Sequence, residues 1–399
     1  MNGQTMDASR ICADLVTIRS ENPPGNTADV IEYIRTLLDS LGIRSIVTLN
    51  AGGKCNLVTS GTQHRLLLCG HVDVVPAMDH GWTYPPFCGK IKDGYVWGRG
   101  ATDMKGGCAA LLSACAAQIK KGMELPATLA FVCDEETGGE QGIRYLLAKK
   151  LITPGDCLIA EPTPARHPCI GQKGLCRLEL KFSGTPGHGS LYPMVGVSAV
   201  MEAAELLSYV KSLHAQEYPY DAALKEIITR SSAVFAREFN ISGGSEILQR
   251  LMFNPGIITG GEKANIVAQH CDLDLEMRVP WGCSIPDLLS KIRLHAPHGT
   301  IIKETVNDPS LTDPACDLVT LACNEVQKVY GGNVYPIVQW AASDARHLRL
   351  AGFNVIEYGP GELSTLHAVN ERIAIESIEK ASEIYQGIMC AYAGKMIEK

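Results

Sequence analysis

The sequence predicts an α/β protein whose mostly parallel sheet is interrupted by an inserted α+β domain. Short apolar runs rich in β-forming residues alternate with helical stretches as far as Ala160, which is typical of a parallel sheet covered by helices. Near Lys173 the pattern changes to strands that alternate apolar and polar residues, which indicates a sheet with one exposed face. The first pattern returns in the C-terminal part, so the second domain is expected to be an insertion.

The N-terminal part begins with helical segments. Residues 7–42 predict a helix, a loop with the sequence ENPPGN and a second helix that ends at Gly42. Three apolar runs follow as expected strands, and an alanine-rich helix between them has small side chains that suit close packing on a sheet. These segments are Leu66–Cys69, Cys108–Lys121, Ala127–Cys133 and Cys157–Ala160.

The inserted domain has its own order of elements. Arg177–Gly184 and Cys271–Pro280 alternate like half-exposed strands, and each is followed by a helix, Ser198–Leu213 and Ile285–His295. Beyond the insertion, Phe353–Tyr358 predicts another strand and a long helix closes the chain. We therefore predict a main domain of residues 1–175 and 307–399 and an inserted domain of residues 176–306.

The composition argues against several classes of protein. The 399 residues are 46% hydrophobic and 20% charged, which is typical of a folded globular chain. A net charge of −7 without a basic cluster predicts no nucleic-acid binding, and no apolar run is long enough to span a membrane. No secretory signal is visible at the N-terminus. The fifteen cysteines are scattered without a CxxC pair, which predicts free thiols in a reducing cytoplasm and argues against a cysteine metal site.

Histidines and carboxylates follow the ends of the expected strands. In open parallel sheets, binding sites form where the carboxyl ends of the strands meet, so these residues are expected to converge in one cleft. They lie in the segments HVDVVP, GRGATDMKGG, CDEETGG, AEPT and GPGELSTLH. The residues are His71 and Asp73, Asp103, Glu135 and Glu136, Glu161, and His367.

Two imidazoles with several carboxylates predict a site for two divalent ions, either zinc or cobalt or manganese. One carboxylate must bridge ions that lie about 3.5–4 Å apart, and together the ions lower the pKa of a water. Asp73 lies two residues beyond His71, where its carboxylate can accept the proton of the far ring nitrogen. The adjacent Glu135 and Glu136 can divide two tasks, one as a metal ligand and one as the base that takes a proton from water.

The five motifs together resemble the co-catalytic zinc family of acetylornithine deacetylase, succinyl-diaminopimelate desuccinylase and carboxypeptidase G, over nearly the whole chain. The resemblance implies a zinc-peptidase-like fold with two Zn²⁺ (or Co²⁺ or Mn²⁺) per chain. It implies that Asp103 bridges the ions and precedes a cis peptide bond. It also implies that Glu135 is the general base and that Asp73 supports His71. The implied ligands of one ion are His71 and Glu161, and those of the other are Glu136 and His367.

The inserted domain shares the resemblance, which implies a lid and dimerisation domain and a homodimer formed through it. His188, in SGTPGHGS, corresponds to a residue that reaches across the dimer interface in relatives and polarises the scissile carbonyl. Asn265 and Arg278 stand where relatives bind the carboxylate of the substrate, and the planar guanidinium of arginine suits that contact. Secondary candidates for substrate contact are Lys173, Asp344 and Arg346.

These features predict hydrolysis of an amide bond that releases an acetyl or succinyl group from a small N-acyl amino acid. A carboxypeptidase or dipeptidase would use the same metals, and the catalytic motifs do not separate these activities. Met252–Gly261 resembles the deacylase branch and favours N-acyl amino acids, whereas the alanines at 341–342 differ from the threonine or glycine of some relatives. A non-catalytic protein that binds amino acids is the alternative from another class, but it would be expected to lack the base or a ligand.

Overall fold

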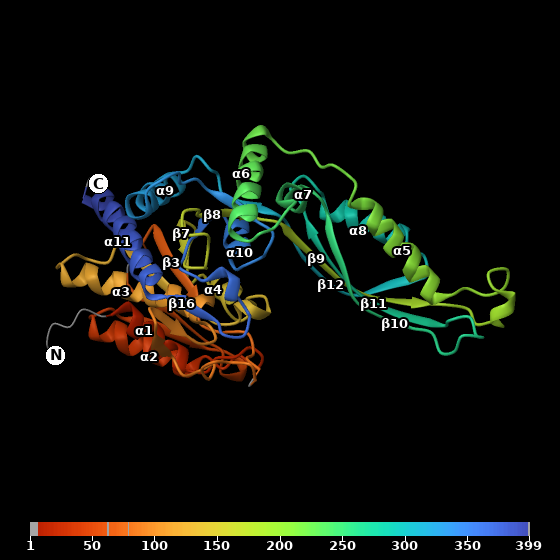
Figure 1. Ribbon diagram of the computed structural model, residues 1–399, viewed down its shortest axis with the longest axis horizontal. Coiled ribbons are helices and arrows are strands. Elements are labelled where there is room, and N and C mark those ends of the chain that lie inside the picture. The colour runs from red at the N-terminus through yellow and green to blue at the C-terminus, as the bar shows by residue number, and fades with distance from the viewer. Residues whose placement is uncertain (1–6, 62–63, 79, 398–399) are drawn as a thin grey trace. The chain divides into compact units, whose positions relative to one another are not determined.

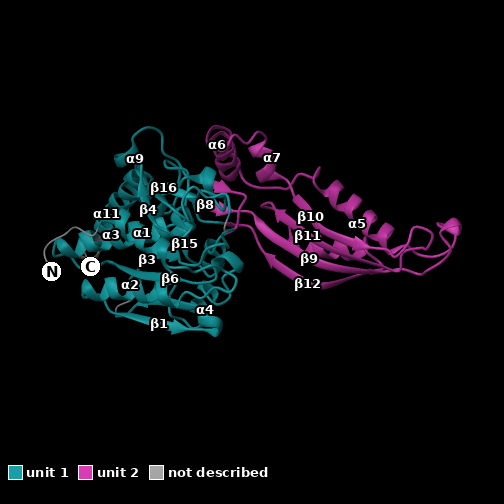
Figure 2. Cartoon of the chain, turned by 60° about the horizontal axis from the view of Figure 1, so that its bottom comes forward, with its two compact units in different colours: residues 1–170, 311–337, 343–399 teal, residues 171–310, 338–342 magenta. Residues whose placement is uncertain are grey.

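The chain is folded into two compact units, shown in Figure 2. The computed structural model describes residues 7–61, 64–78 and 80–397. Unit 1 contains residues 1–170, 311–337 and 343–399, and unit 2 contains residues 171–310 and 338–342. The sequence-based boundaries lie at residues 175 and 306, and the return of residues 338–342 to unit 2 was not anticipated.

Unit 1 is built on the parallel centre of a nine-stranded sheet (Figure 1). Strands β6 (Ala127–Val132), β3 (Leu66–His71), β7 (Asp156–Ile159) and β15 (Asn354–Glu357) are neighbours in this order and run parallel. The first three are buried along their whole length, which explains their continuous apolar runs. The predicted mostly parallel sheet is confirmed. The sheet is extended at its edges by β1 (Ser45–Leu49), β2 (Cys55–Thr59), β8 (Cys169–Gln172), β13 (Ser310–Leu311) and β14 (Ile337–Gln339).

Helices surround this sheet. The alanine-rich helix α3 (Gly106–Lys120) packs against α1 (Ala8–Thr17) and α11 (Ile375–Ile397). A Cβ at Gly107 would lie 2.1 Å from the backbone oxygen of Ala160, so glycine is required where α3 begins. Within the described ranges, no helix is both long and apolar enough to cross a membrane. The other helices of unit 1 are α2 (Ala28–Ser40), α4 (Ile143–Ala148), α9 (Asp317–Tyr330) and α10 (Ala345–Leu350).

A small three-stranded sheet in unit 1 joins two distant parts of the chain. Its order is β16-β5-β4, and Arg372 of β16 is paired with Trp97 of β5. This pairing fixes the segment that follows β5 against the segment that precedes β16, and both of these segments carry residues of the site described below. The strands are β4 (Lys90–Lys92), β5 (Tyr95–Trp97) and β16 (Arg372–Ala374).

Unit 2 contains a four-stranded antiparallel sheet in the order β10-β11-β9-β12. Alternate residues of β9 and β11 are buried, as expected for half-exposed strands, and they form a core with residues of α5 (Ala199–Leu213) and α8 (Ile285–Leu294). The remaining helices are α6 (Ala222–Glu238) and α7 (Gly244–Gln249). The strands are β9 (Gly174–Ser183), β10 (Met252–Gly260), β11 (His270–Val279) and β12 (Gly299–Asn307).

Candidate metal centre

His71 is the last residue of β3 and directs its ring towards Asp103. His71 Nε2 lies 3.0 Å from Asp103 Oδ1, and His71 Nδ1 lies 2.9 Å from the backbone oxygen of Asp73. The residue is only 2% exposed, and β3 pairs with a strand on each side. Both ring nitrogens of this histidine are therefore held in place by the fold.

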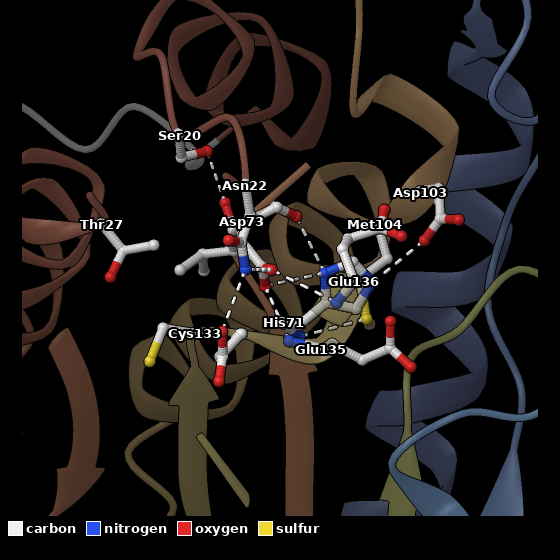
Figure 3. Close-up of polar contacts among 12 residues, drawn as sticks. Ser20, Asn22, Thr27, His71, Asp73, Asp103, Met104, Cys133, Glu135 and Glu136 are labelled. Atoms are coloured by element: carbon white, nitrogen blue, oxygen red, sulfur yellow. Dashed lines mark hydrogen bonds and ion pairs between the residues drawn. The ribbon is translucent and has the colours of Figure 1, made fainter. Parts of the chain in front are cut away.

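The carboxylate of Asp73 binds the turn that carries Glu135 and Glu136 (Figure 3). Asp73 Oδ1 accepts a hydrogen bond from Glu135 N at 3.2 Å, and Oδ2 accepts from Glu136 N at 3.3 Å and from Asn22 Nδ2 at 2.8 Å. The carboxylate lies 3.6 Å from His71 Nδ1, so the closer acceptor for the ring is the backbone oxygen. Asp73 thus contacts His71 through both its backbone oxygen and its carboxylate, and the same carboxylate holds the turn.

Asp103 lies in the short turn η2 (Ala101–Lys105) before α3. Its peptide bond to Met104 is cis, as the resemblance implied. The two carboxylate oxygens face different histidines, with Oδ1 3.0 Å from His71 Nε2 and Oδ2 3.1 Å from His367 Nε2. Although burial raises the pKa of Asp103, hydrogen bonds from His367 and His71 hold that pKa well below its usual range. A carboxylate placed in this way can bridge two ions.

Two groups of three residues could each hold an ion. In each group, the potential ligand atoms all lie within 4.8 Å of one another, and Asp103 belongs to both groups. Glu161 Oε1, just beyond β7, lies 3.7 Å from His71 Nε2, and Glu136 Oε1 lies 3.5 Å from His367 Nε2. The structure therefore brings together the five residues that the resemblance implied as ligands. The first group is His71, Asp103 and Glu161, and the second is Asp103, Glu136 and His367.

The chemistry of these residues fits divalent cations. Burial raises the pKa of Glu161 and Glu136, because a buried carboxylate without a cation is costly in its charged form. Within the described part of the chain, the buried oxygen Oε1 of Glu136 makes no hydrogen bond. Imidazole nitrogens and carboxylate oxygens are the donors that zinc accepts, and cobalt and manganese accept them as well.

Glu135 keeps its carboxylate available in the turn η3 (Glu135–Thr137). Asp73 holds its backbone N–H, and among the described residues its side chain has no hydrogen-bond partner. Burial raises the pKa of Glu135 well above its usual range, and the carboxylates of Asp344 and Glu136 raise it further. A free carboxylate with a raised pKa beside a cation site suits a general base.

Two buried residues that the sequence analysis did not single out help to hold this centre together. The side-chain amide of Asn22, in the ENPPGN loop, donates to Asp73 Oδ2 at 2.8 Å and to Asp134 Oδ1 at 3.1 Å. Glu371 accepts hydrogen bonds from the backbone of the segment that carries Asp103. Neither residue follows a predicted strand, although Glu371 lies only four residues after His367.

Comparison with known proteins identifies the family. The family described as Peptidase family M20/M25/M40 matches residues 67–391. The chain belongs to this family. It is therefore a metal-dependent hydrolase that acts on amide bonds.

Relatives of known name cover most of this M20 chain. A succinyl-diaminopimelate desuccinylase from Cereibacter sphaeroides is 28% identical over 97% of this chain and 99% of its own length. Another from Helicobacter hepaticus is 26% identical over 81% of this chain and 78% of its own length. The crystal structure of an M20 family metallo-carboxypeptidase from Sulfolobus solfataricus has a TM-score of 0.78 at 18% identity and covers 97% of this chain and 99% of that one. A dinuclear metal binding M20 peptidase from Bacillus subtilis has a TM-score of 0.66 at 11% identity, with 96% and 97% covered.

Unit 2 of this M20 chain places His188 beside Asn265. His188 forms an isolated β-bridge with Ile266, and Gly189 N donates to the backbone oxygen of Asn265 at 2.9 Å. The side chains of His188 and Asn265 are exposed. Ser190 N donates to His188 Nδ1 at 3.3 Å, and Ser190 Oγ lies 2.8 Å from the same nitrogen, so Ser190 orients the ring through Nδ1.

Arg278 lies at the opposite end of the same sheet. The register of β9 and β11 places His270 opposite Ser183 and Arg278 opposite Leu175. From His270 to Arg278 the strand spans about 26 Å at about 3.3 Å per residue. His188 follows Ser183, so one small substrate cannot contact both His188 and Arg278 of the same unit.

Lys173 is buried and binds the C-terminal end of α7. Its Nζ donates to the backbone oxygens of Ile247 and Arg250, both at 2.6 Å, and the residue is 1% exposed. Burial lowers the pKa of Lys173 to about 7, and the positive charge of Arg278 lowers it further. These contacts favour a role in holding α7 over direct contact with a substrate.

We expect Lys173→Met to change how stability depends on pH. The pKa of about 7 in the folded protein lies below the ordinary value of 10.5, so the folded state carries the cost of a buried charge below pH 7 and loses that cost as pH rises towards 10.5. Between these pH values, the free energy of unfolding of the wild-type protein should therefore rise relative to that of Lys173→Met. Each kcal/mol of this rise corresponds to an increase in Tm of about 2–4 °C. Thermal unfolding across this range measures the difference. Lys181→Met, which alters an exposed lysine of β9, is the control, and a Lys173→Met difference that stays constant with pH would contradict the expectation.

Asp344 and Arg346 lie buried behind the Glu135 turn. Asp344 is 2% exposed, and a Cβ at Gly139 would lie 2.4 Å from its Oδ1. Burial raises the pKa of Asp344 to about 7. Arg346 Nη1 donates to the backbone oxygen of Ser343 at 2.8 Å. The charges of both side chains act on Glu135, since Asp344 raises the pKa of Glu135 and Arg346 lowers it.

Proposed function

We propose that this enzyme removes an acyl group, acetyl or succinyl, from the nitrogen of a small N-acyl amino acid. The observation that carries the proposal is Asp103 facing two groups of ligands, with Glu135 directly before the ligand Glu136 in the turn η3 and its charge acting on Glu161. The substrate class is supported by the relatives named succinyl-diaminopimelate desuccinylase, which are similar to this chain over as much as 97% of its length. The solved peptidases are less than 20% identical and carry only the fold.

The proposed roles follow from the geometry of unit 1. Two divalent ions, when bound, would polarise the scissile carbonyl and lower the pKa of the attacking water. Glu135 accepts a proton from that water and passes it to the amine that leaves. Asp73 keeps Glu135 in place by binding its backbone N–H.

For unit 2, the proposed roles are stabilisation of developing charge and recognition of the substrate. His188 donates its Nε2 proton to the oxyanion that forms from the carbonyl. Arg278 of one chain and Asn265 of a second copy, which lies beside the His188 of that copy, bind the carboxylate of the substrate. The side chain of Arg278 is 30% exposed and already bound to a carboxylate, that of Glu276, at 2.8 Å.

We propose that the enzyme acts as a homodimer in which His188 of one chain serves the metal centre of the other. The separation of about 26 Å between the two ends of the β11 strand supports this, because a small substrate cannot span it. β10 lies at the edge of its sheet, and its residues 254–260 are all exposed. It carries exposed apolar side chains, Ile257 at 59% and Ile258 at 49%. A long apolar edge strand is a hazard unless another strand covers it, and a second copy would do so.

A cytoplasmic location is proposed from the thiols. All fifteen cysteines, each within the described ranges, are free, and eleven of them are buried. Free thiols in such number suit a reducing compartment.

A panel of substrates tests the proposed function. We expect the enzyme, supplied in turn with Zn²⁺, Co²⁺ and Mn²⁺, to show a higher kcat/KM for N-succinyl-diaminopimelate or N-acetylornithine than for any dipeptide. The rival activity is that of a carboxypeptidase or dipeptidase, which would use the same metals. A dipeptide as the best substrate would establish the rival, and no turnover with any of the three metals would favour a protein that only binds amino acids.

A further inference from the structure

We propose that Glu371 is a positioning residue of the metal centre, which fixes the bridging carboxylate of Asp103 and links it to His367. Glu371 is fully buried. Its Oε1 accepts hydrogen bonds from Thr102 N at 3.0 Å and Asp103 N at 3.1 Å, and its Oε2 pairs with Arg99 Nη1 at 2.5 Å. Arg99 Nη2 donates in turn to the backbone oxygen of His367 at 3.2 Å. The carboxylate of Glu371 thus binds the backbone of Asp103, which belongs to both metal groups. Through Arg99 it is also linked to the backbone of His367.

The backbone at Asp103 depends on this distant side chain. Asp103 has φ −120° and ψ 99°, and Met104 has φ −127° and ψ 32°, so neither has helical geometry inside η2. N–H groups at the start of a helix lack acceptors within that helix and need a partner from elsewhere. Glu371, 268 residues away in sequence, supplies that acceptor for Asp103. The location of the bridging carboxylate is therefore set by a tertiary contact and not by local structure.

The segment that carries His367 belongs to the same hydrogen-bonded assembly. Glu371 directly precedes β16, which pairs with β5, and Thr102 Oγ1 donates to the backbone oxygen of Arg372 at 2.7 Å. Both Asp103 and His367 of the second metal group are attached to this assembly, whereas the first group contributes only Asp103. A disturbance at Glu371 should therefore weaken the second ion more than the first.

A buried glutamate next to an arginine could instead serve only to neutralise the arginine charge. Unit 1 contains such a pair for comparison, because Arg349 and Glu357 are 2% and 0% exposed in their side chains and 2.9 Å apart. Glu357 also accepts a hydrogen bond from Ser343 Oγ at 2.5 Å. Neither Arg349 nor Ser343 is a proposed ligand, and the substitution Glu357→Asp keeps the negative charge that Glu357 places near Glu161, so Glu357 offers a comparable buried carboxylate–arginine pair.

The substitution Glu371→Asp separates the two roles. Aspartate keeps the negative charge beside Arg99 but is shorter by one C–C bond, about 1.5 Å, so it cannot keep both backbone contacts. This inference rests on the metal sites of the proposed function, but metal affinity is measured without substrate. Calorimetric titration of the metal-free protein with Zn²⁺ is expected to show one of the two ions bound about 10–100-fold more weakly. The visible spectrum of the Co²⁺-loaded variant should change as well, whereas Glu357→Asp should leave both affinities and the spectrum unaltered.

Wild-type affinity for both ions, with an unaltered cobalt spectrum, in a folded Glu371→Asp protein would overturn the inference. If that variant does not fold, Arg99→Lys replaces it, since lysine keeps the positive charge but loses the fork that reaches His367. Weaker binding of one ion is again expected, and unaltered binding would overturn the inference. A failure of the substrate panel would leave these metal measurements unaffected, so the two proposals can fail separately.

Discussion

Glu135→Gln is expected to lower kcat by about 10²–10⁴-fold while the protein still binds two ions. Glutamine cannot take a proton from water at neutral pH, but its backbone N–H can still bind Asp73, so the turn should keep its shape. The affected step is proton transfer, and for that reason kcat should fall much more than the affinity for substrate changes. Steady-state kinetics on the best substrate, together with metal analysis of the purified variant, measure both effects.

The matched control is Glu140→Gln. Glu140 is an exposed glutamate five residues further along the same segment, so its substitution removes the same charge without touching the centre. It should keep kcat within about twofold, as most surface substitutions do. Near-normal turnover in Glu135→Gln would show that Glu135 is not the general base. Loss of an ion from that variant would instead make Glu135 a ligand, in conflict with the separate roles assigned to Glu135 and Glu136.

The parallel sheet and the clustering of the site residues at one edge of it could both be predicted from the sequence, for one physical reason. Buried parallel strands are continuous apolar runs, and the residues directly after them must meet at one edge of the sheet. His71 at the end of β3, Glu135 and Glu136 after β6, and Glu161 after β7 follow this rule, and the structure brings them together. The predicted mostly parallel fold is confirmed.

The buried residues that hydrogen-bond to the metal centre but are not themselves proposed ligands could not be predicted in this way. Asn22 and Glu371 act on backbone N–H groups and carboxylates that are distant in sequence, and such contacts leave no local pattern. The same limit applies to Asp73, whose carboxylate lies closer to the backbone N–H of Glu135 than to the His71 ring, because the Glu135 turn follows a different strand.

Unit 2 contains two elements that the sequence analysis did not predict, β10 and α6. β10 contains Asn254, Pro255 and Gly256, which ordinarily indicate a turn, and its register shifts between Pro255 and Ile257. An edge strand tolerates proline and irregularity because one side of it needs no partner. α6, in contrast, has buried residues at helical spacing, such as Leu224, Ile228 and Phe235, and could have been predicted.

A mixed dimer that joins one His188→Ala chain to one Glu135→Ala chain is expected to recover about half of the wild-type activity per dimer. Each parent dimer should be impaired, by about 10²–10³-fold for loss of an oxyanion donor and by about 10²–10⁴-fold for loss of the base. If His188 acts on the other chain, the mixed dimer has one site with both defects and one site with none. Co-expression with two different affinity tags and successive purification on both would isolate this species for kinetic analysis.

The alternative arrangement gives the opposite result. If His188 served the centre of its own chain, each site of the mixed dimer would keep one defect, and the activity would stay as low as that of the parents. A dimer of Glu135→Ala with the double variant Glu135→Ala/His188→Ala is the control, because it contains no intact base and should stay inactive under either arrangement. The distance of about 26 Å between the His188 and Arg278 ends of the unit 2 sheet favours recovery, since a small substrate that is held by Arg278 of one chain can be reached only by the histidine of another.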